Sequence, residues 1–318
     1  MDGDTRGLGA RVGGGRSTPS RRLVLLGGAG SIALLAGCGL RLDLPQPPPP
    51  VPTRRPATDE SLLLAVVTDV AGLVTAAGQV LARGDDPDAS TLRTVRAVRS
   101  VLRSQLTVVR GRLTNAGVPT RTVDAAARAV PGTAAVRSAP ALASRLDAVG
   151  AAQWQRVAAA SADTRRLLTT AYAARLASGV LLGGDVALSA PSPARPAVVA
   201  RTQPLVYAFE VVAAQSSGRQ RRTAETTLEA LTRLEAAVSG SGTNPPAGWS
   251  LPFPVTSSAD ASRLATHTLS AAVETTASLA GTSPTAAALE DVARWSAHVQ
   301  ALATRWDLPL TAFPGATT

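Results

Sequence analysis

The sequence contains no lysine, one cysteine and two histidines among 318 residues, and only 3% of its residues are aromatic. A single cysteine cannot form an intrachain disulfide, so the fold must be held together by its hydrophobic core. All 32 basic residues are arginine. Where lysine is never used, the choice of arginine at one position says little about function. The scarcity of aromatic residues among these arginines argues against nucleic-acid binding.

Sequence patterns that carry catalytic chemistry are also absent. The chain has no Gly-x-Ser-x-Gly nucleophile elbow, no phosphate-binding loop and no carboxylates clustered near a histidine. These are among the patterns by which enzyme active sites are recognised in a sequence. The sequence therefore predicts no reaction, no catalytic residue and no cofactor.

Residues 1–37 have the order of an export signal, with a polar and basic stretch, an apolar run and then small residues. The pair Arg21 and Arg22, followed by apolar residues, is typical of a twin-arginine signal. The apolar run at 23–36 is shorter than the roughly 20 residues that span a bilayer, so it is not a stable transmembrane helix. We therefore expect residues 1–37 to act as a signal peptide.

The apolar run closes with Leu35-Ala36-Gly37-Cys38, which contains the only cysteine of the chain. This stretch resembles a bacterial lipobox. The resemblance implies a diacylglycerol group on the Cys38 sulfur, cleavage before Cys38 and acylation of the new amino group. Two or more acyl chains hold a protein stably to a bilayer. A signal cut elsewhere, with Cys38 as a spare thiol, is the alternative interpretation.

Residues 38–57 are expected to form a tether between the lipidated cysteine and the folded part of the chain. The prolines of this tether are Pro45, Pro47 to Pro50, Pro52 and Pro56. They favour polyproline II geometry, in which about a dozen residues at about 3.1 Å each reach roughly 35–40 Å from the membrane. The first helix is then expected to begin near Thr58.

Residues 58–188 have the apolar spacing of four helices, which are expected to begin near Thr58, Ser90, Pro140 and Asp163. The clearest of them runs from Ser90 to Asn115. Its apolar residues recur at spacings of three and four, and they are Leu92, Val95, Val98, Leu102, Leu106, Val109 and Leu113. Such a seam is typical of a helix that packs in a bundle.

Three prolines, at positions 191, 193 and 196, mark the boundary to a second unit at residues 195–318. Four further helices are predicted there. The apolar seam of the last one is Leu289, Val292, Trp295, Val299, Leu302 and Trp306. No segment alternates with period two for long enough to predict a strand. The predicted fold class is therefore all-α, with two consecutive four-helix units at 58–188 and 195–318.

Several motifs of the second unit carry a resemblance to a family. They are Pro204-Leu205-Val206-Tyr207-Ala208-Phe209-Glu210, Leu251-Pro252-Phe253-Pro254-Val255-Thr256, the helix from Arg263-Leu264-Ala265 and the closing Phe313-Pro314-Gly315. Through them residues 195–315 resemble the ferritin-like domain of unknown function that is found in actinobacterial lipoproteins, and the leader and tether also look like those of such twin-arginine-exported proteins. The resemblance implies a ferritin-like four-helix bundle but no agreed activity.

A di-iron site of the ferritin type needs a Glu from each of two helices and a Glu-x-x-His motif from each of the other two. Leu264 stands three residues before His267, where this motif needs Glu. Trp295 takes the same place before His298. We expect both histidines to lie on the polar sides of their helices. Glu210 is the nearest approach to a metal ligand, and an ion pair with an arginine is the simpler role for it, so no metal site is predicted.

Charge is unevenly distributed along the chain. Residues 39–193 contain 18 arginines against 11 acidic residues, whereas residues 194–318 contain 9 of each. The predicted helix at 90–115 has no acidic residue, and its arginines are Arg93, Arg96, Arg99, Arg103, Arg110 and Arg112. One interpretation is a solvated face that is partly offset by the preceding acids Asp59, Glu60, Asp69 and Asp85. The other is contact with anionic lipid or with an acidic partner in the cell envelope.

Two hypotheses of function follow. The favoured one is an exported lipoprotein, anchored to the outer face of the cytoplasmic membrane, that binds or scaffolds envelope components without catalysis. It predicts that the interior of the bundle is apolar throughout. The alternative is a ferritin-like, metal-dependent oxidoreductase, which requires buried carboxylates that converge on one point.

Replacing Cys38 by Ala is expected to release the protein from the membrane, because the acylated sulfur is then lost. Replacing Arg21 and Arg22 by Lys is expected to block export, because the signal then lacks its paired arginines. Fractionation of cells that express each variant measures both effects. An unchanged membrane fraction for Cys38→Ala would contradict the lipid anchor.

Overall fold

The computed structural model describes residues 54–83, 88–129, 136–188, 195–239 and 248–317. Arg21, Arg22, Cys38 and the tether up to Thr53 lie outside these residues. The described residues contain helices and no strand, so the fold is all-α. The span Arg54–Thr318 is one compact unit that holds the whole described core.

Six helices precede the proline-rich break at 191–196 and five follow it, within the described residues. The first six are α1 (Glu60–Arg83), α2 (Ala89–Asn115), α3 (Thr120–Arg128), α4 (Ala139–Asp147), α5 (Ala151–Ala158) and α6 (Ala162–Leu181). The other five are α7 (Arg195–Gln215), α8 (Gly218–Ser239), α9 (Ser258–Glu274), α10 (Thr276–Thr282) and α11 (Ala286–Thr304).

This helix count corrects the four-plus-four division in three places. The apolar spacing does not predict α3, because a nine-residue helix whose one buried residue is Val123 leaves no periodic pattern. The predicted helix from Pro140 splits into α4 and α5, since the backbone leaves the helix at Ala148 and restarts after Gly150. The helix expected from Ser258 to Ala280 is interrupted at Thr275, which separates α9 from α10.

The seam predicted for the second helix is confirmed. In α2 the residues Val95, Val98, Leu102, Val109 and Leu113 are buried, and Leu92 and Leu106 are partly buried. The helix begins at its N-cap Asp88, whose Oδ1 accepts hydrogen bonds from the amides of Ser90 and Thr91. It ends just before Gly117, which has a φ of 80°.

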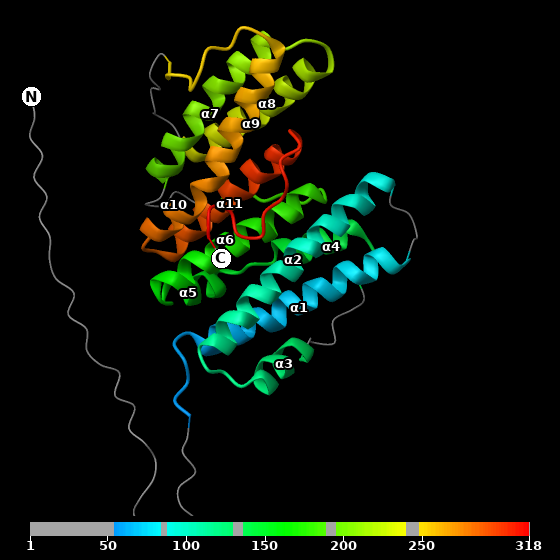
Figure 1. The fold of residues 1–318 in the computed structure, drawn as a ribbon, viewed down its shortest axis with the longest axis vertical. Coiled ribbons are helices and arrows are strands. Elements are labelled where there is room, and N and C mark those ends of the chain that lie inside the picture. Colours follow the sequence, from blue (N-terminus) through cyan, green and yellow to red (C-terminus); the bar gives the residue numbers. More distant parts are fainter. Residues whose placement is uncertain (1–53, 84–87, 130–135, 189–194, 240–247, 318) are drawn as a thin grey trace, which may run out of the picture. The chain divides into compact units, whose positions relative to one another are not determined.

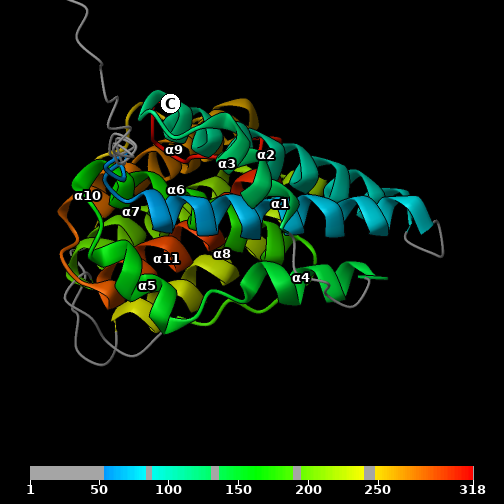
Figure 2. The ribbon, with the colours of Figure 1, turned by 90° about the horizontal axis from the view of Figure 1, so that it is seen from below.

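The described helices form two groups, which meet where α6 packs against α11. α1 packs against α2, with α3 and α4 also in contact with α1 (Figure 2). In the second group α7 packs against α8 and α9, and α11 contacts α7, α8 and α9. In Figure 1, α6 lies between these groups, and its most extensive contact is with α11. Because α6 comes from the first half of the sequence and α11 from the second, the two halves share one core.

The first helix, α1, is long and apolar enough to cross a membrane by length and composition over Glu60–Ala82. This is weak evidence of a span, because core helices pass the same test. Here half of the apolar window is buried inside the protein. The buried α1 residues include Val66, Val67 and Val70, which belong to the main core.

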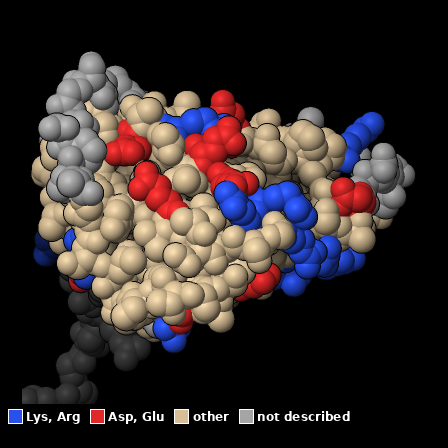
Figure 3. Space-filling view, turned by 90° about the horizontal axis from the view of Figure 1, so that it is seen from above, with Lys and Arg blue, Asp and Glu red and all other residues tan. Residues whose placement is uncertain are grey.

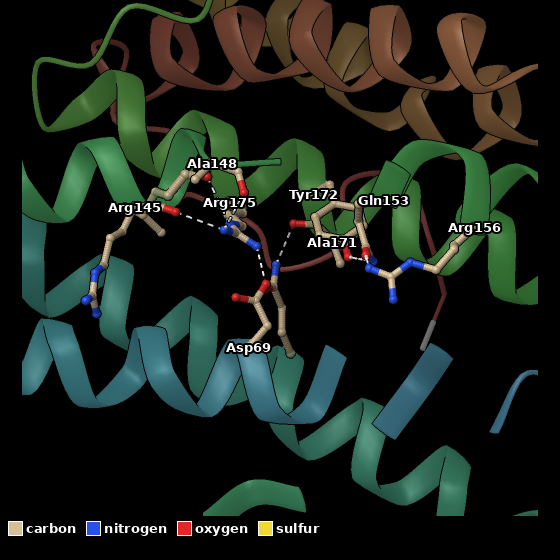
Figure 4. A network of polar contacts seen from close by, with 10 residues as sticks. Asp69, Arg145, Ala148, Gln153, Arg156, Ala171, Tyr172 and Arg175 are labelled. Carbon is tan, nitrogen blue, oxygen red and sulfur yellow. Dashed lines mark hydrogen bonds and ion pairs between the residues drawn. The ribbon is translucent and has the colours of Figure 1, made fainter. Parts of the chain in front are cut away.

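Arg175 of α6 is a buried charge that joins α6 to two other helices (Figure 4). Its Nε donates to the carbonyl oxygen of Leu146 at 2.9 Å, and its Nη2 donates to that of Arg145 at 2.9 Å. These carbonyls lie at the C-terminal end of α4. The last carbonyl oxygens of a helix have no backbone N–H of the same helix to accept from. The Nη1 atom forms an ion pair with Asp69 of α1. One guanidinium therefore positions α1, α4 and α6 relative to one another.

The amide of Gln105 makes a similar connection from α2. The side chain is buried, and its Nε2 donates to the carbonyl oxygens of Ala171 at 2.8 Å and Ala312 at 3.0 Å. Ala171 belongs to α6 and Ala312 to the C-terminal segment. A buried donor with two backbone acceptors has its desolvation compensated, so this contact fixes α2 and the C-terminal segment on α6.

The prediction of a bundle interior that is apolar throughout is wrong. Asp291 of α11 is buried and forms an ion pair with Arg195 of α7 at 2.7 Å. The indole nitrogen of Trp295 donates to Thr202 Oγ1 at 2.9 Å. Helical periodicity predicts only that Trp295 belongs to the apolar seam, whereas a buried indole N–H also needs an acceptor.

Replacing Trp295 by Ala is expected to lower the free energy of unfolding by about 3–5 kcal/mol, because the ring is fully buried and its loss leaves a cavity. Urea denaturation of the chain from Gly39 onward, which contains the whole described core, measures this change. Trp249→Ala is the matched control, since Trp249 is only partly buried and should cost less. A loss for Trp295→Ala no larger than for the control would contradict a core role.

Candidate functional site

The arginines of α2 were the surface site predicted from the sequence, and the structure places them in different surroundings, with Arg112 exposed in the last turn of the helix. Arg93, Arg96 and Arg103 are exposed on the side of α2 that faces away from its buried seam. Arg99 is half-buried and lies against Gly78 of α1. Its Nη2 is 3.4 Å from the position that a Cβ atom would take on this glycine. Arg110 forms an ion pair with Asp124 of α3. We call Arg93, Arg96 and Arg103 the α2 arginine stripe.

The acids that were expected to offset these arginines have other partners. Asp59 accepts hydrogen bonds from the amide and hydroxyl of Ser161, the latter at 2.6 Å. Glu60 pairs with Arg54, and Asp69 pairs with Arg175. The fourth acid, Asp85, lies outside the described residues.

The stripe is therefore a concentration of positive charge. Within the described ranges, no carboxylate forms an ion pair with Arg93, Arg96 or Arg103. From Arg93 to Arg103 the chain rises by ten helical steps, or about 15 Å. Figure 3 shows one face of the molecule on which basic side chains gather mainly in one area instead of alternating evenly with acidic ones. Clustered, unpaired arginines attract anionic surfaces.

Glu210, the nearest approach to a metal ligand in the sequence, is exposed on α7. Asp291 is the buried carboxylate of the same helix group, and Arg195 pairs with it. Among the residues that the structure describes, no three His, Cys, Asp or Glu side chains lie close enough together to hold a metal ion. The described part of the bundle thus does not bring together the carboxylates that the oxidoreductase hypothesis requires.

The two histidines have different surroundings. His267 is exposed on α9, as expected, with its ring 6.1 Å from the ring of Phe253. His298 was also expected on a polar side, but it is half-buried on α11, and this expectation is wrong. The segment after α6 folds over α11 and covers His298, with the carbonyl oxygen of Val186 2.7 Å from Nε2. Helical periodicity within α11 carries no information about a covering segment more than a hundred residues away.

Burial lowers the pKa of His298, and the positive charge of Arg294 lowers it further, although the hydrogen bond to Val186 and the charge of Asp185 act in the opposite direction. The net shift is downward from the ordinary value of 6.5. His298 is therefore a neutral imidazole at pH 7. Because a carbonyl oxygen can only accept, Nε2 carries the proton and donates it to Val186.

Comparison with protein-family models, with curated proteins and with solved structures gave no significant match for this chain. The candidate sites are therefore judged on geometry and charge. By these criteria we take the α2 arginine stripe and the neighbourhood of His298 as candidate sites within the described part of the chain.

The lowered pKa of His298 predicts a pH dependence of stability. The unfolded chain binds a proton as pH falls below about 6.5, whereas the folded chain does so only at lower pH. Stability from this group is thus fully present above pH 6.5 and is lost between 6.5 and the lower folded pKa. Urea denaturation at several pH values should show a smaller loss on acidification for His298→Gln, which keeps a donor for Val186 but does not titrate.

His267→Gln is the matched control for this experiment, because its ring is exposed. It should keep the acid sensitivity of the unsubstituted protein. Identical pH profiles for His298→Gln and the unsubstituted protein would show that His298 is not held neutral by burial.

Proposed function

We propose that this protein is an exported lipoprotein, anchored through Cys38 to the outer face of the cytoplasmic membrane, that binds anionic components of the cell envelope without catalysis. The lipobox and the paired arginines Arg21 and Arg22 support the anchor and the export route. The α2 arginine stripe supports the binding role. Its ligand is an anionic lipid surface, with an acidic envelope polymer or protein as the alternative.

One observation carries the binding role, namely that Asp59, Glu60 and Asp69, three acids that precede α2, are engaged elsewhere. Asp69 pairs with the buried Arg175, and Asp59 ties the start of α1 to Ser161 at the start of α6. These contacts hold the carboxylates away from the stripe. No described carboxylate forms an ion pair with Arg93, Arg96 or Arg103, and Arg93 donates from Nε to the carbonyl oxygen of Ala89 in its own helix at 3.3 Å. The positive charge of these arginines is therefore available to a ligand.

The strength of this attraction is sufficient for a protein that is already tethered. A basic residue close to an anionic membrane contributes about 1 kcal/mol. Three arginines therefore supply about 3 kcal/mol, or roughly a hundredfold in affinity. Screening limits the effect to about 8 Å at physiological salt. The stripe must consequently come close to the surface, which the tether between Cys38 and Arg54 has to permit.

We further propose that α7, α8, α9 and α11 form the ferritin-like four-helix bundle implied by the motifs of the second half. The contacts of α7 with α8 and α9, and those of α11 with α7, α8 and α9, support this proposal. The packing of α6 along α11 adds a helix from the first half to one side of that bundle. The bundle then acts as a rigid scaffold that presents α2 at its periphery.

Replacing Arg93, Arg96 and Arg103 together by Gln is expected to weaken binding to phosphatidylglycerol vesicles about a hundredfold at low salt, because about 3 kcal/mol of attraction is lost. Co-sedimentation of the chain from Gly39 onward with vesicles measures the affinity. Raising the salt concentration should detach the unsubstituted protein.

The matched control replaces Arg201, Arg219 and Arg222 by Gln. These arginines are exposed on α7 and α8, so the net charge falls equally but the stripe stays intact. Equal weakening by both triple variants would indicate a non-specific charge effect and contradict the proposed stripe. Equal binding to neutral phosphatidylcholine vesicles would contradict it as well.

A metal analysis separates this proposal from the oxidoreductase alternative. The purified protein is expected to contain no stoichiometric iron or manganese, and EDTA should leave its melting temperature unchanged. Stoichiometric metal that is lost on replacing Glu210 by Gln would favour the oxidoreductase instead.

A further inference from the structure

A cavity of about 350 Å³ lies where the two halves of the chain meet. Its walls come from α8, from α11 and from the end of α6 with the segment that follows it. Most lining residues are aliphatic, and they include Val180, Leu188, Leu234 and Leu302. A mainly apolar cavity of this size with a few polar groups is typical of a small-molecule site.

The wall formed by the segment after α6 is fixed in place by two hydrogen bonds from α11. Arg294 donates from Nη1 to the carbonyl oxygen of Ala187 at 2.9 Å, and His298 donates to that of Val186 at 2.7 Å. The Val186 side chain is buried beneath them. The cavity is therefore preformed, and a ligand would not have to order this wall on binding.

His298 is one of the lining residues, and its ring keeps one acceptor. Since Nε2 carries the proton, Nδ1 keeps its lone pair, and no donor in the described part of the chain bonds to it. The ring stays neutral because it is shielded from water. An imidazole nitrogen in this state binds a ligand that offers an O–H or N–H group.

Two guanidinium groups and one carboxylate complete the polar lining. Arg233 comes from α8, Arg305 follows α11 and Asp185 follows α6. With His298 neutral, two positive charges and one negative charge leave a lining charge of +1. Arg233 has an exposed partner, Glu229, at 3.6 Å, and such exposed pairs contribute little. Both arginines can thus turn toward an anion in the cavity.

We propose that this cavity binds an amphiphilic carboxylate, with its apolar chain against the aliphatic walls and its carboxylate on Arg233 and Arg305. The two arginines supply the charge-assisted hydrogen bonds that a carboxylate prefers. His298 Nδ1 adds an acceptor for a hydroxyl or amide N–H near the head group of the ligand. The site lies on other helices than the α2 arginine stripe, so this inference does not depend on the proposed function.

Calorimetric titration with decanoate tests the proposal, and decanol is the neutral comparison ligand. The chain from Gly39 onward is used. Decanoate should bind at least about tenfold more tightly than decanol, because decanol cannot make charge-assisted hydrogen bonds to the arginines. The double variant Arg233→Gln, Arg305→Gln should lose that preference. The control pair Arg219→Gln, Arg222→Gln lies on the same helix outside the cavity and should keep it.

The position of the ligand is tested by filling the cavity. Ala237 is an exposed lining residue, so Ala237→Phe should block binding while leaving the fold intact. Its exposed neighbour Ala236 does not line the cavity, and Ala236→Phe should leave binding unchanged. Failure of the unsubstituted protein to bind decanoate, equal binding of decanol, or unchanged binding by Ala237→Phe would each overturn the proposal.

Discussion

The burial of Arg175 is the constraint on which the arrangement of the first half depends. A guanidinium taken out of water must have its donors satisfied, or the charge destabilises the fold. Arg175 meets this requirement with the free carbonyls at the end of α4 and with Asp69 of α1. Neither α1 nor α4 can shift along α6 without leaving a buried donor unpaired. The interaction therefore fixes how far α1 and α4 are displaced along α6, in addition to holding the three helices together.

The same requirement for satisfied polar groups shapes the second half. α11 is buried on most of its circumference, and it carries Asp291 and Trp295 into the interior. Each of these polar groups has a partner on α7, namely Arg195 and Thr202. An apolar seam can slide by one turn at modest cost, but a seam with paired polar groups cannot. These pairs thus specify which residues of α7 and α11 face each other.

The parts of the fold that the sequence predicts are those with local causes. The seam of α2 follows from spacings of three and four residues within one helix, and it is buried as expected. The short helix α3 and the break between α4 and α5 depend on tertiary contacts, and periodicity does not detect them. Arg175 is one of 32 arginines in the sequence, and nothing in its local pattern distinguishes a buried arginine from an exposed one.

The candidate sites divide in the same way. The α2 arginine stripe could be predicted, because the absence of acids from Ser90 to Asn115 is visible in one stretch of sequence. The sequence could not show that Arg110 does not belong to the stripe, because this depends on the position of Asp124 on α3. The cavity at His298 could not be predicted, because its walls are brought together from residues 180–188, 230–237 and 298–305.

The packing of α6 along α11 also sets the order of events during synthesis. The hydrogen bonds from Arg294 to Ala187 and from His298 to Val186 join residues 107 and 112 positions apart. A ribosome that adds about 5–20 residues per second releases α11 several seconds after α6. Until then the part of α6 that packs on α11 has no cover, although α2, α4 and α5 already contact other parts of α6. On the proposed twin-arginine route, which carries folded proteins, the chain becomes competent for export only after α11 has emerged.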